Sequence, residues 1–74
     1  MEVLLFGIIA EKAGKESLML TASDTRELRV RLNEAMPFLT ALSYAIAVDR
    51  VLLKGDHALS GTEEIALLPP FAGG

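Results

Sequence analysis

The sequence predicts an α+β fold in which one main helix covers a mixed sheet of four to five strands. Three features support this class. An apolar run opens the chain, a one-sided helical pattern follows, and short apolar runs bounded by turn residues fill the second half. A helix of this kind must bury its apolar side against one face of the sheet, so two layers are expected. With 74 residues the chain is expected to form one domain.

The first part of the chain predicts an antiparallel hairpin. Residues 2–10 predict a buried strand, since their apolar run is far shorter than the roughly 18 residues of a membrane span. Residues 11–15 are polar and contain Gly14, which predicts a turn. Residues 16–21 predict the second strand. Two strands joined by a short glycine-containing loop are typical of a hairpin.

The main helix is predicted over about residues 24–36. Ser23 or Asp24 can cap its start, and Asp24 to Glu27 has the spacing of a capping box. Apolar residues then recur at helical spacing, while arginine and glutamate take most of the remaining positions. Pro37 ends the helix, because proline disfavours helical geometry in the residue before it.

The second half predicts three short strands. Residues 37–42 are ambiguous between a short helical turn and an irregular crossing, and residues 44–48 predict a buried strand. Residues 51–53 predict a short edge strand or hairpin arm. Residues 64–68 predict the last strand, which two prolines end because proline cannot donate to a sheet ladder. If this strand pairs in parallel beside a central first strand, residues 1–68 form a β-grasp, or ubiquitin-like, roll.

Composition and charge narrow the classes of function. The chain has no cysteine and one histidine, so neither a disulfide framework nor the usual metal cluster is expected, and no cofactor is expected. A net charge of −3 opposes binding to nucleic acid or to an anionic membrane surface. No basic segment precedes the apolar start, so the cytoplasm is the expected location. A hydrophobic content of 51% suits either an exposed patch for a partner protein or a leucine-rich core.

Few side chains could carry chemistry. His57 lies in a turn beside an aspartate, but neighbouring turn residues need not face each other, so a solvated loop histidine is expected. Asp49 and Arg50 predict a charge pair at a strand end. Glu63 and Glu64 are neighbours whose side chains would point to opposite faces of a strand. The chain is therefore not expected to be an enzyme by itself.

The C-terminal segment, PPFAGG, is predicted to be an extended arm. Its two prolines favour an extended course, its aromatic residue offers one apolar anchor, and its two glycines could pass through a channel too narrow for a Cβ atom. When extended, the segment spans about 20 Å. The reactive group at its tip could only be the terminal carboxylate of Gly74. The predicted tail comprises Pro69, Pro70, Phe71, Ala72, Gly73 and Gly74.

Segments along nearly the whole chain resemble the small subunit of molybdopterin synthase, a MoaD-like sulfur carrier. VLLFGIIAEKAG resembles the family's first strand and following turn, AIAVD its mid-chain strand, LSGTEEIALLPP its last turn and strand, and PPFAGG its C-terminal signature. Two positions depart from the family pattern. Asp49 stands where the family commonly has asparagine, and residues 60–62 stand where it has a more acidic turn.

The resemblance implies a cycle of sulfur transfer in molybdenum cofactor biosynthesis. An E1-like adenylyltransferase would use ATP to adenylate the carboxylate of Gly74, and a sulfurtransferase would supply sulfur to convert the acyl-adenylate to a thiocarboxylate. The carrier would then dock on the large synthase subunit and insert its tail, Pro69 to Gly73 leading to Gly74. There it would give up sulfur to a pterin precursor. The catalytic side chains are expected on that large subunit.

Three alternatives remain open from the sequence. A ThiS-like carrier of thiamine synthesis shares the fold and the Gly-Gly end, although Pro69 and Pro70 favour the molybdopterin branch. A ubiquitin-like protein modifier would use the same activated Gly74 to form an isopeptide bond with a target lysine. A plain interaction module would have an inert tail.

Overall fold

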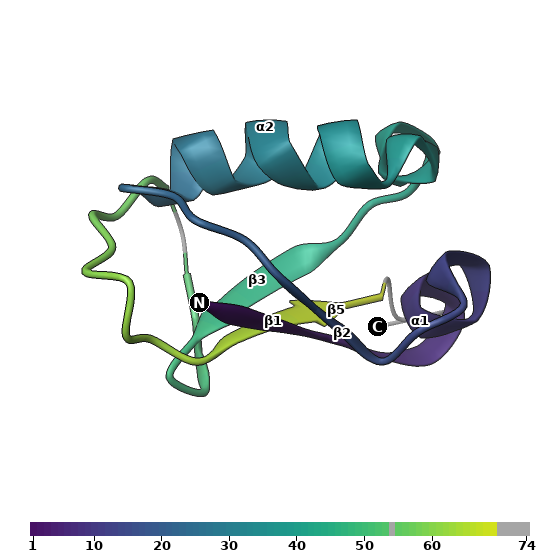
Figure 1. The fold of residues 1–74 in the computed structure, drawn as a ribbon, viewed down its shortest axis with the longest axis horizontal. Coiled ribbons are helices and arrows are strands. Elements are labelled where there is room, and N and C mark those ends of the chain that lie inside the picture. Colours follow the sequence, from purple (N-terminus) through teal and green to yellow (C-terminus); the bar gives the residue numbers. More distant parts are fainter. Residues whose placement is uncertain (54, 70–74) are drawn as a thin grey trace.

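One helix lies across one face of a mixed sheet, as Figure 1 shows for α2. The structure is a computed structural model that describes residues 1–53 and 55–69. Within those residues the strands are β1 (Glu2–Leu5), β2 (Ser17–Met19), β3 (Ala45–Val48), β4 (Val51–Leu52) and β5 (Ile65–Leu68). The helices are α1 (Gly7–Ala13), α2 (Thr25–Ala35) and a 3₁₀ helix, η1 (Pro37–Ala41).

The strand order is β2-β1-β5-β3-β4. β1 pairs antiparallel with β2 and parallel with β5, while β3 pairs antiparallel with both β5 and β4. The expected parallel pairing of the first and last strands is therefore confirmed. β1 lies inside the sheet as expected, but β5 takes its middle position. The C-terminal segment therefore begins at the end of the middle strand of the sheet.

The core lies between the sheet and α2. Val3, Leu5, Ile65 and Leu67 alternate along the paired strands β1 and β5, and all are almost completely buried. Alternation places these side chains on one sheet face. The apolar stripe of α2, which includes the buried Leu28 and Leu32, belongs to the same cluster. No helix within residues 1–53 and 55–69 covers the opposite face of the sheet (Figure 1).

The expected strand over residues 2–10 is wrong beyond Leu5. The backbone of Gly7 has φ of +55°, which takes the chain out of the extended conformation, and α1 begins there. Phe6, Ile9 and Ala10 recur at helical spacing, and Ile9 is fully buried. Burial of one side of this short helix in the core therefore outweighs the strand preference of the apolar run.

The expected turn over residues 11–15 is also wrong, since α1 includes its first three residues. Gly14 does end the helix in the left-handed conformation, and its N–H donates to the carbonyl oxygens of Ala10 and Glu11. β1 and β2 still pair antiparallel as predicted. Their connection, however, is a helix with its glycine cap and not a short loop.

The boundaries of α2 agree with its sequence signals. The carboxylate of Asp24 accepts a hydrogen bond from the Glu27 amide at 2.7 Å, and the Glu27 carboxylate accepts one from the Ser23 amide at 2.8 Å. The helix ends at Ala35, and the ambiguous stretch after it forms η1 from Pro37. No helix among the described residues is long and apolar enough to cross a bilayer.

Candidate functional site at the root of the tail

The root of the predicted tail is held by the middle strand of the sheet. β5 has hydrogen-bonded neighbours on both sides and ends at Leu68, and Pro69 follows as the last described residue. The direction in which the chain leaves the domain is therefore set by a paired strand. The rest of the tail lies outside the described residues, namely Pro70, Phe71, Ala72, Gly73 and Gly74.

Pro69 packs directly against the start of α1. A Cβ atom placed on Gly7 would lie 2.9 Å from the Cγ atom of Pro69, closer than non-bonded carbon atoms approach. Gly7 therefore permits a contact between two segments that lie far apart in the sequence. Sequence reasoning missed this contact. Its signal was a glycine inside an apolar run, which can indicate a close approach of backbone.

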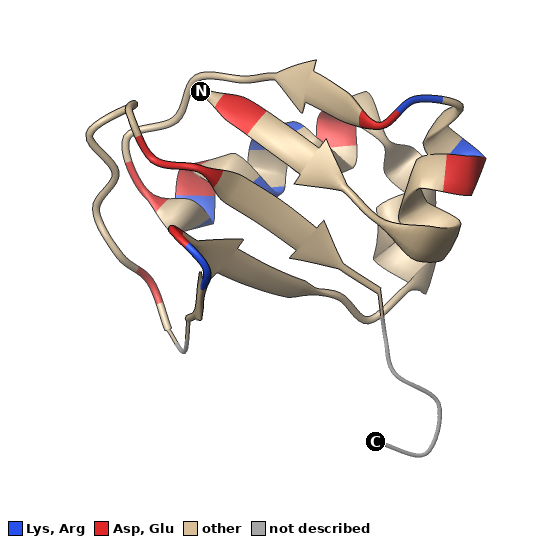
Figure 2. Ribbon diagram, turned by 90° about the horizontal axis from the view of Figure 1, so that it is seen from below, with Lys and Arg blue, Asp and Glu red and all other residues tan. Residues whose placement is uncertain are grey.

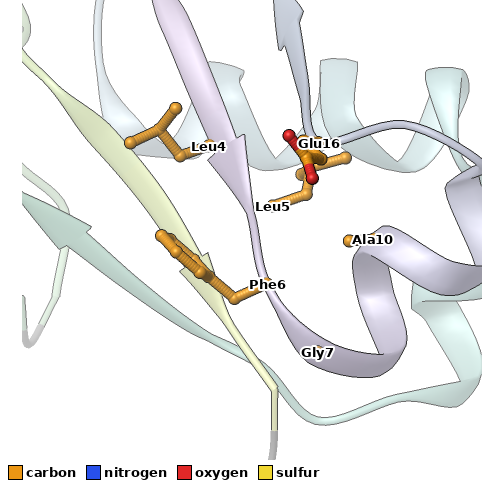
Figure 3. A pocket seen from close by; sticks show the side chains of 6 residues that line it. All are labelled: Leu4, Leu5, Phe6, Gly7, Ala10 and Glu16. Atoms are coloured by element: carbon orange, nitrogen blue, oxygen red, sulfur yellow. The ribbon is translucent and has the colours of Figure 1, made fainter.

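A groove of about 450 Å³ adjoins this contact and includes Gly7 in its lining. Figure 3 shows Leu4 and Phe6 pointing to one side of the groove and Ala10 of α1 lying on the other. Apart from the carboxylate of Glu16, the side chains of the lining are apolar. The lining residues are Leu4, Leu5, Phe6, Gly7, Ala10 and Glu16.

The groove opens beside an apolar surface on the uncovered side of the sheet, which we call the open face. The register aligns Leu4 with Ala66, Ala66 with Ala47, and Ala47 with Leu52, so these side chains share that face. Phe6 and Leu52 are strongly exposed, at 44% and 60%. The open face comprises Leu4, Phe6, Met19, Ala45, Ala47, Leu52, Ala66 and Leu68.

Charged residues border the open face but do not interrupt it, as Figure 2 shows. Glu2 begins β1 and Glu64 precedes β5, so acidic groups flank one end of the two strands. Arg50 follows β3 in the turn to β4 and forms an exposed ion pair with Glu64, with 3.6 Å between Nε and Oε1. An apolar centre with a charged rim is the usual anatomy of a protein-binding surface.

His57 belongs to a structural connection at the start of α2. Its backbone N–H donates to the buried hydroxyl oxygen of Thr25 at 2.9 Å, and its carbonyl oxygen accepts from the Thr25 amide at 2.9 Å. The Thr25 hydroxyl also lies 3.5 Å from a carboxylate oxygen of Asp56. These contacts, made by the backbone of His57, anchor the loop before β5 to the helix.

The other candidate charges stabilise turns. Asp49 accepts a hydrogen bond from the Glu64 amide at 2.9 Å, so it binds the neighbouring strand and does not pair with Arg50 as expected. A hydrogen bond from the Ser60 amide is the main cause that lowers the pKa of Glu63 to about 2. The described residues hold no group of three or more histidine, cysteine or acidic side chains that could bind a metal ion.

The chain is similar to known small β-grasp proteins. The model of the ThiS family matches residues 3–74. A protein in the complex of subunits 1 and 2 of molybdopterin-converting factor from Helicobacter pylori is 33% identical, with a TM-score of 0.74. That match covers 99% of this chain and 96% of the other. A search of curated proteins gives no match.

Two archaeal structures are also similar. Small archaeal modifier protein 1 from Methanosarcina acetivorans is 25% identical with a TM-score of 0.84, and the match covers 99% of this chain and 94% of the other. Small archaeal modifier protein 1 from Haloferax volcanii is 20% identical with a TM-score of 0.81, and the match covers 95% of each of the two chains. At this identity the similarity concerns the fold alone. The predicted β-grasp fold is confirmed by these similarities and by the sheet topology.

Proposed function

This chain belongs to the ThiS family of β-grasp sulfur carriers, and we propose that it carries sulfur as a thiocarboxylate on Gly74 during molybdenum cofactor biosynthesis in the cytoplasm. Proteins of this family are non-catalytic carriers. The structural observation that supports the proposal is the position of the tail root. The middle strand and Gly7 hold Pro69 beside the open face, so a partner bound there would receive the C-terminal carboxylate from a fixed direction.

The chemistry proceeds in two steps at the terminal carboxylate. A carboxylate oxygen of Gly74 attacks the α-phosphorus of ATP, which forms an acyl-adenylate and releases pyrophosphate. Sulfur at the oxidation level of sulfide, supplied by a sulfurtransferase, then attacks the acyl carbon, and AMP leaves as the thiocarboxylate forms. In this scheme the E1-like adenylyltransferase supplies the catalytic groups, which agrees with the absence of cysteine from the chain.

The molybdopterin branch is supported by the similarity to the Helicobacter pylori complex of two converting-factor subunits. We propose that the open face docks on the large synthase subunit, with Met19, Leu52 and Phe6 as its most exposed large side chains. The tail, from Pro69 through Pro70, Phe71, Ala72 and Gly73 to Gly74, would enter that subunit's active site. Sulfur would then pass to a pterin precursor.

A second candidate function is attachment to other proteins. Its support is the similarity to a small archaeal modifier protein at 25% identity over nearly the whole chain. The same acyl-adenylate on Gly74 would then react with a lysine amine of a target protein. A ThiS-like role in thiamine synthesis requires the same thiocarboxylate, and the match to the family model does not choose between the sulfur pathways.

Intact mass spectrometry tests the proposal. The chain is incubated with ATP, an adenylyltransferase of the molybdopterin pathway and a sulfide source, and we expect one terminal oxygen to be replaced by sulfur. A chain lacking Gly73 and Gly74 is the control, because an exposed tail contributes little to folding. It should fold normally and keep its mass. Sulfur transfer to a pterin precursor in the presence of the large subunit identifies the pathway, whereas lysine conjugates in a cell extract favour the modifier.

A further inference from the structure

We propose that Gly7 is a positioning residue that fixes where the tail leaves the domain. The inference rests on the proposed function, in which the tail delivers a reactive carboxylate to a partner. Among the glycines of the described residues, Gly7 is the one at which an added Cβ atom would meet a neighbour. Gly14, Gly55 and Gly61 have no atom within 4 Å of that position.

The contact follows from the register of the two parallel strands. Leu5 is aligned with Leu67 at the end of the β1–β5 ladder. Gly7 follows Leu5 by two residues and Pro69 follows Leu67 by two residues, so the start of α1 and the root of the tail are level with each other. The contact therefore belongs to the sheet geometry and connects the tail root to the segment that lines the groove.

Pro69 has little freedom to move away from a larger residue at position 7. Its ring is closed onto its own backbone nitrogen, so Cγ can move only by a change of ring pucker or by a shift of the main chain. Carbon atoms in contact are normally about 3.5–4.0 Å apart. A Cβ atom at 2.9 Å would therefore displace the ring by at least about 0.6 Å, measured against that normal separation.

A displacement at the root changes where the tip arrives. If extended, the five residues after Pro69 would reach about 17 Å, so a small change of direction at Pro69 would become a larger shift at Gly74. A misplacement of about 1 Å at a reacting group can cost about a hundredfold in rate. Docking through the open face does not involve the tip, so the effect should fall mainly on kcat and much less on KM.

The variants Gly7→Ala and Gly14→Ala form a matched pair. Both glycines belong to α1 or its cap and have left-handed backbones, with φ of +55° and +72°. Alanine therefore introduces similar backbone strain at either position, but only position 7 contacts Pro69. A third variant, Pro69→Ala, removes the Cγ atom and leaves only its Cβ, which is 3.7 Å from the Cβ position of residue 7.

The kinetic experiment measures pyrophosphate release by the adenylyltransferase at varied carrier concentration. We expect Gly7→Ala to lower kcat by about tenfold or more with KM changed less than about twofold, and Gly14→Ala to behave as the wild type. In the Pro69→Ala chain, Gly7→Ala should have no further effect. Equal losses of kcat in Gly7→Ala and Gly14→Ala would overturn the inference. So would an effect of Gly7→Ala that is equally large in the wild-type chain and in the Pro69→Ala chain.

NMR spectroscopy of the free protein decides the inference without a partner. The wild type should show nuclear Overhauser effects between the Gly7 and Pro69 protons, and the resonances of Leu68 and Pro69 should shift in Gly7→Ala but not in Gly14→Ala. Unchanged resonances in Gly7→Ala would overturn the proposed packing. If the wild type itself is not adenylated, the proposed function fails, while this measurement still tests the role of Gly7.

Discussion

Replacing Phe6 by alanine should weaken docking of the carrier on the large synthase subunit by about thirtyfold. An aromatic side chain presents about 200 Å² of surface, and 44% of Phe6 is exposed in the free protein. A partner that covers the exposed part would bury about 90 Å², worth about 2 kcal/mol at about 25 cal/mol per Å². That free energy corresponds to about thirtyfold in the dissociation constant.

Isothermal titration calorimetry with the large subunit measures this change. The matched control is Val30→Ala, since Val30 is also strongly exposed, at 55%, but lies on α2, on the other side of the sheet. The buried part of Phe6 contributes up to about 3 kcal/mol to folding by the same arithmetic, so thermal melting monitored by circular dichroism must show a folded variant. Equal affinity of Phe6→Ala and wild type, or equal weakening by Val30→Ala, would refute docking through the open face.

Three further predictions concern stability. Thr25→Val should lower the free energy of unfolding by about 1–3 kcal/mol in urea denaturation, because it removes a buried acceptor of the His57 amide; a smaller loss would contradict that role. The Ser60 amide lowers the pKa of Glu63 from 4.5 to about 2, so the stability this carboxylate contributes is complete above pH 4.5 and is lost as the pH falls toward 2. Glu63→Gln should make the midpoint of urea denaturation depend less on pH over that interval. An NMR titration that gives Glu63 an ordinary pKa would contradict this prediction. Arg50→Gly should stabilise the fold by about 0.5–1 kcal/mol, since φ is +70° at this position and its exposed ion pair contributes less; an unchanged or lower melting temperature would be inconsistent with relief of strain.

The elements that the sequence predicted well are those with local signals at both ends. The main helix was expected over residues 24–36 and spans Thr25–Ala35, because Asp24 caps its start and Pro37 prevents its continuation. The strands Ala45–Val48 and Ile65–Leu68 likewise lie within their predicted ranges. The last strand ends where Pro69 and Pro70 follow, and Asp49 and Arg50 form the turn after Val48.

The helix α1 could not be predicted in the same way. Its apolar residues continue those of β1 without a break, so the run from Val3 to Ala10 looks like one buried strand. A helix of seven residues is not stable by itself, and this one depends on the burial of Ile9 in the core. Only the glycine at position 7 indicated a change of backbone direction.

The candidate site likewise has one part that the sequence predicts and another part that depends on the fold. The terminal Gly-Gly and the prolines before it are visible in the sequence and predict chemistry at the main-chain carboxylate. The contact between Gly7 and Pro69 is not visible, because it depends on the parallel register of β1 and β5, strands that are separated by most of the chain. The open face was expected only as an apolar excess, and its members became identifiable from the register of the five strands.

The central place of β5 also determines how the domain responds to mechanical force. A partner that pulls on the tail pulls along β5, whose backbone is hydrogen-bonded to β1 on one side and to β3 on the other. Such a load acts on both ladders in shear, so many bonds must break together and they cannot open one at a time as at a sheet edge. Resistance to forced unfolding is set by the unfolding rate, which such loading keeps low. If a partner draws the tail into a channel, as proposed above, the domain should therefore not unravel under that load.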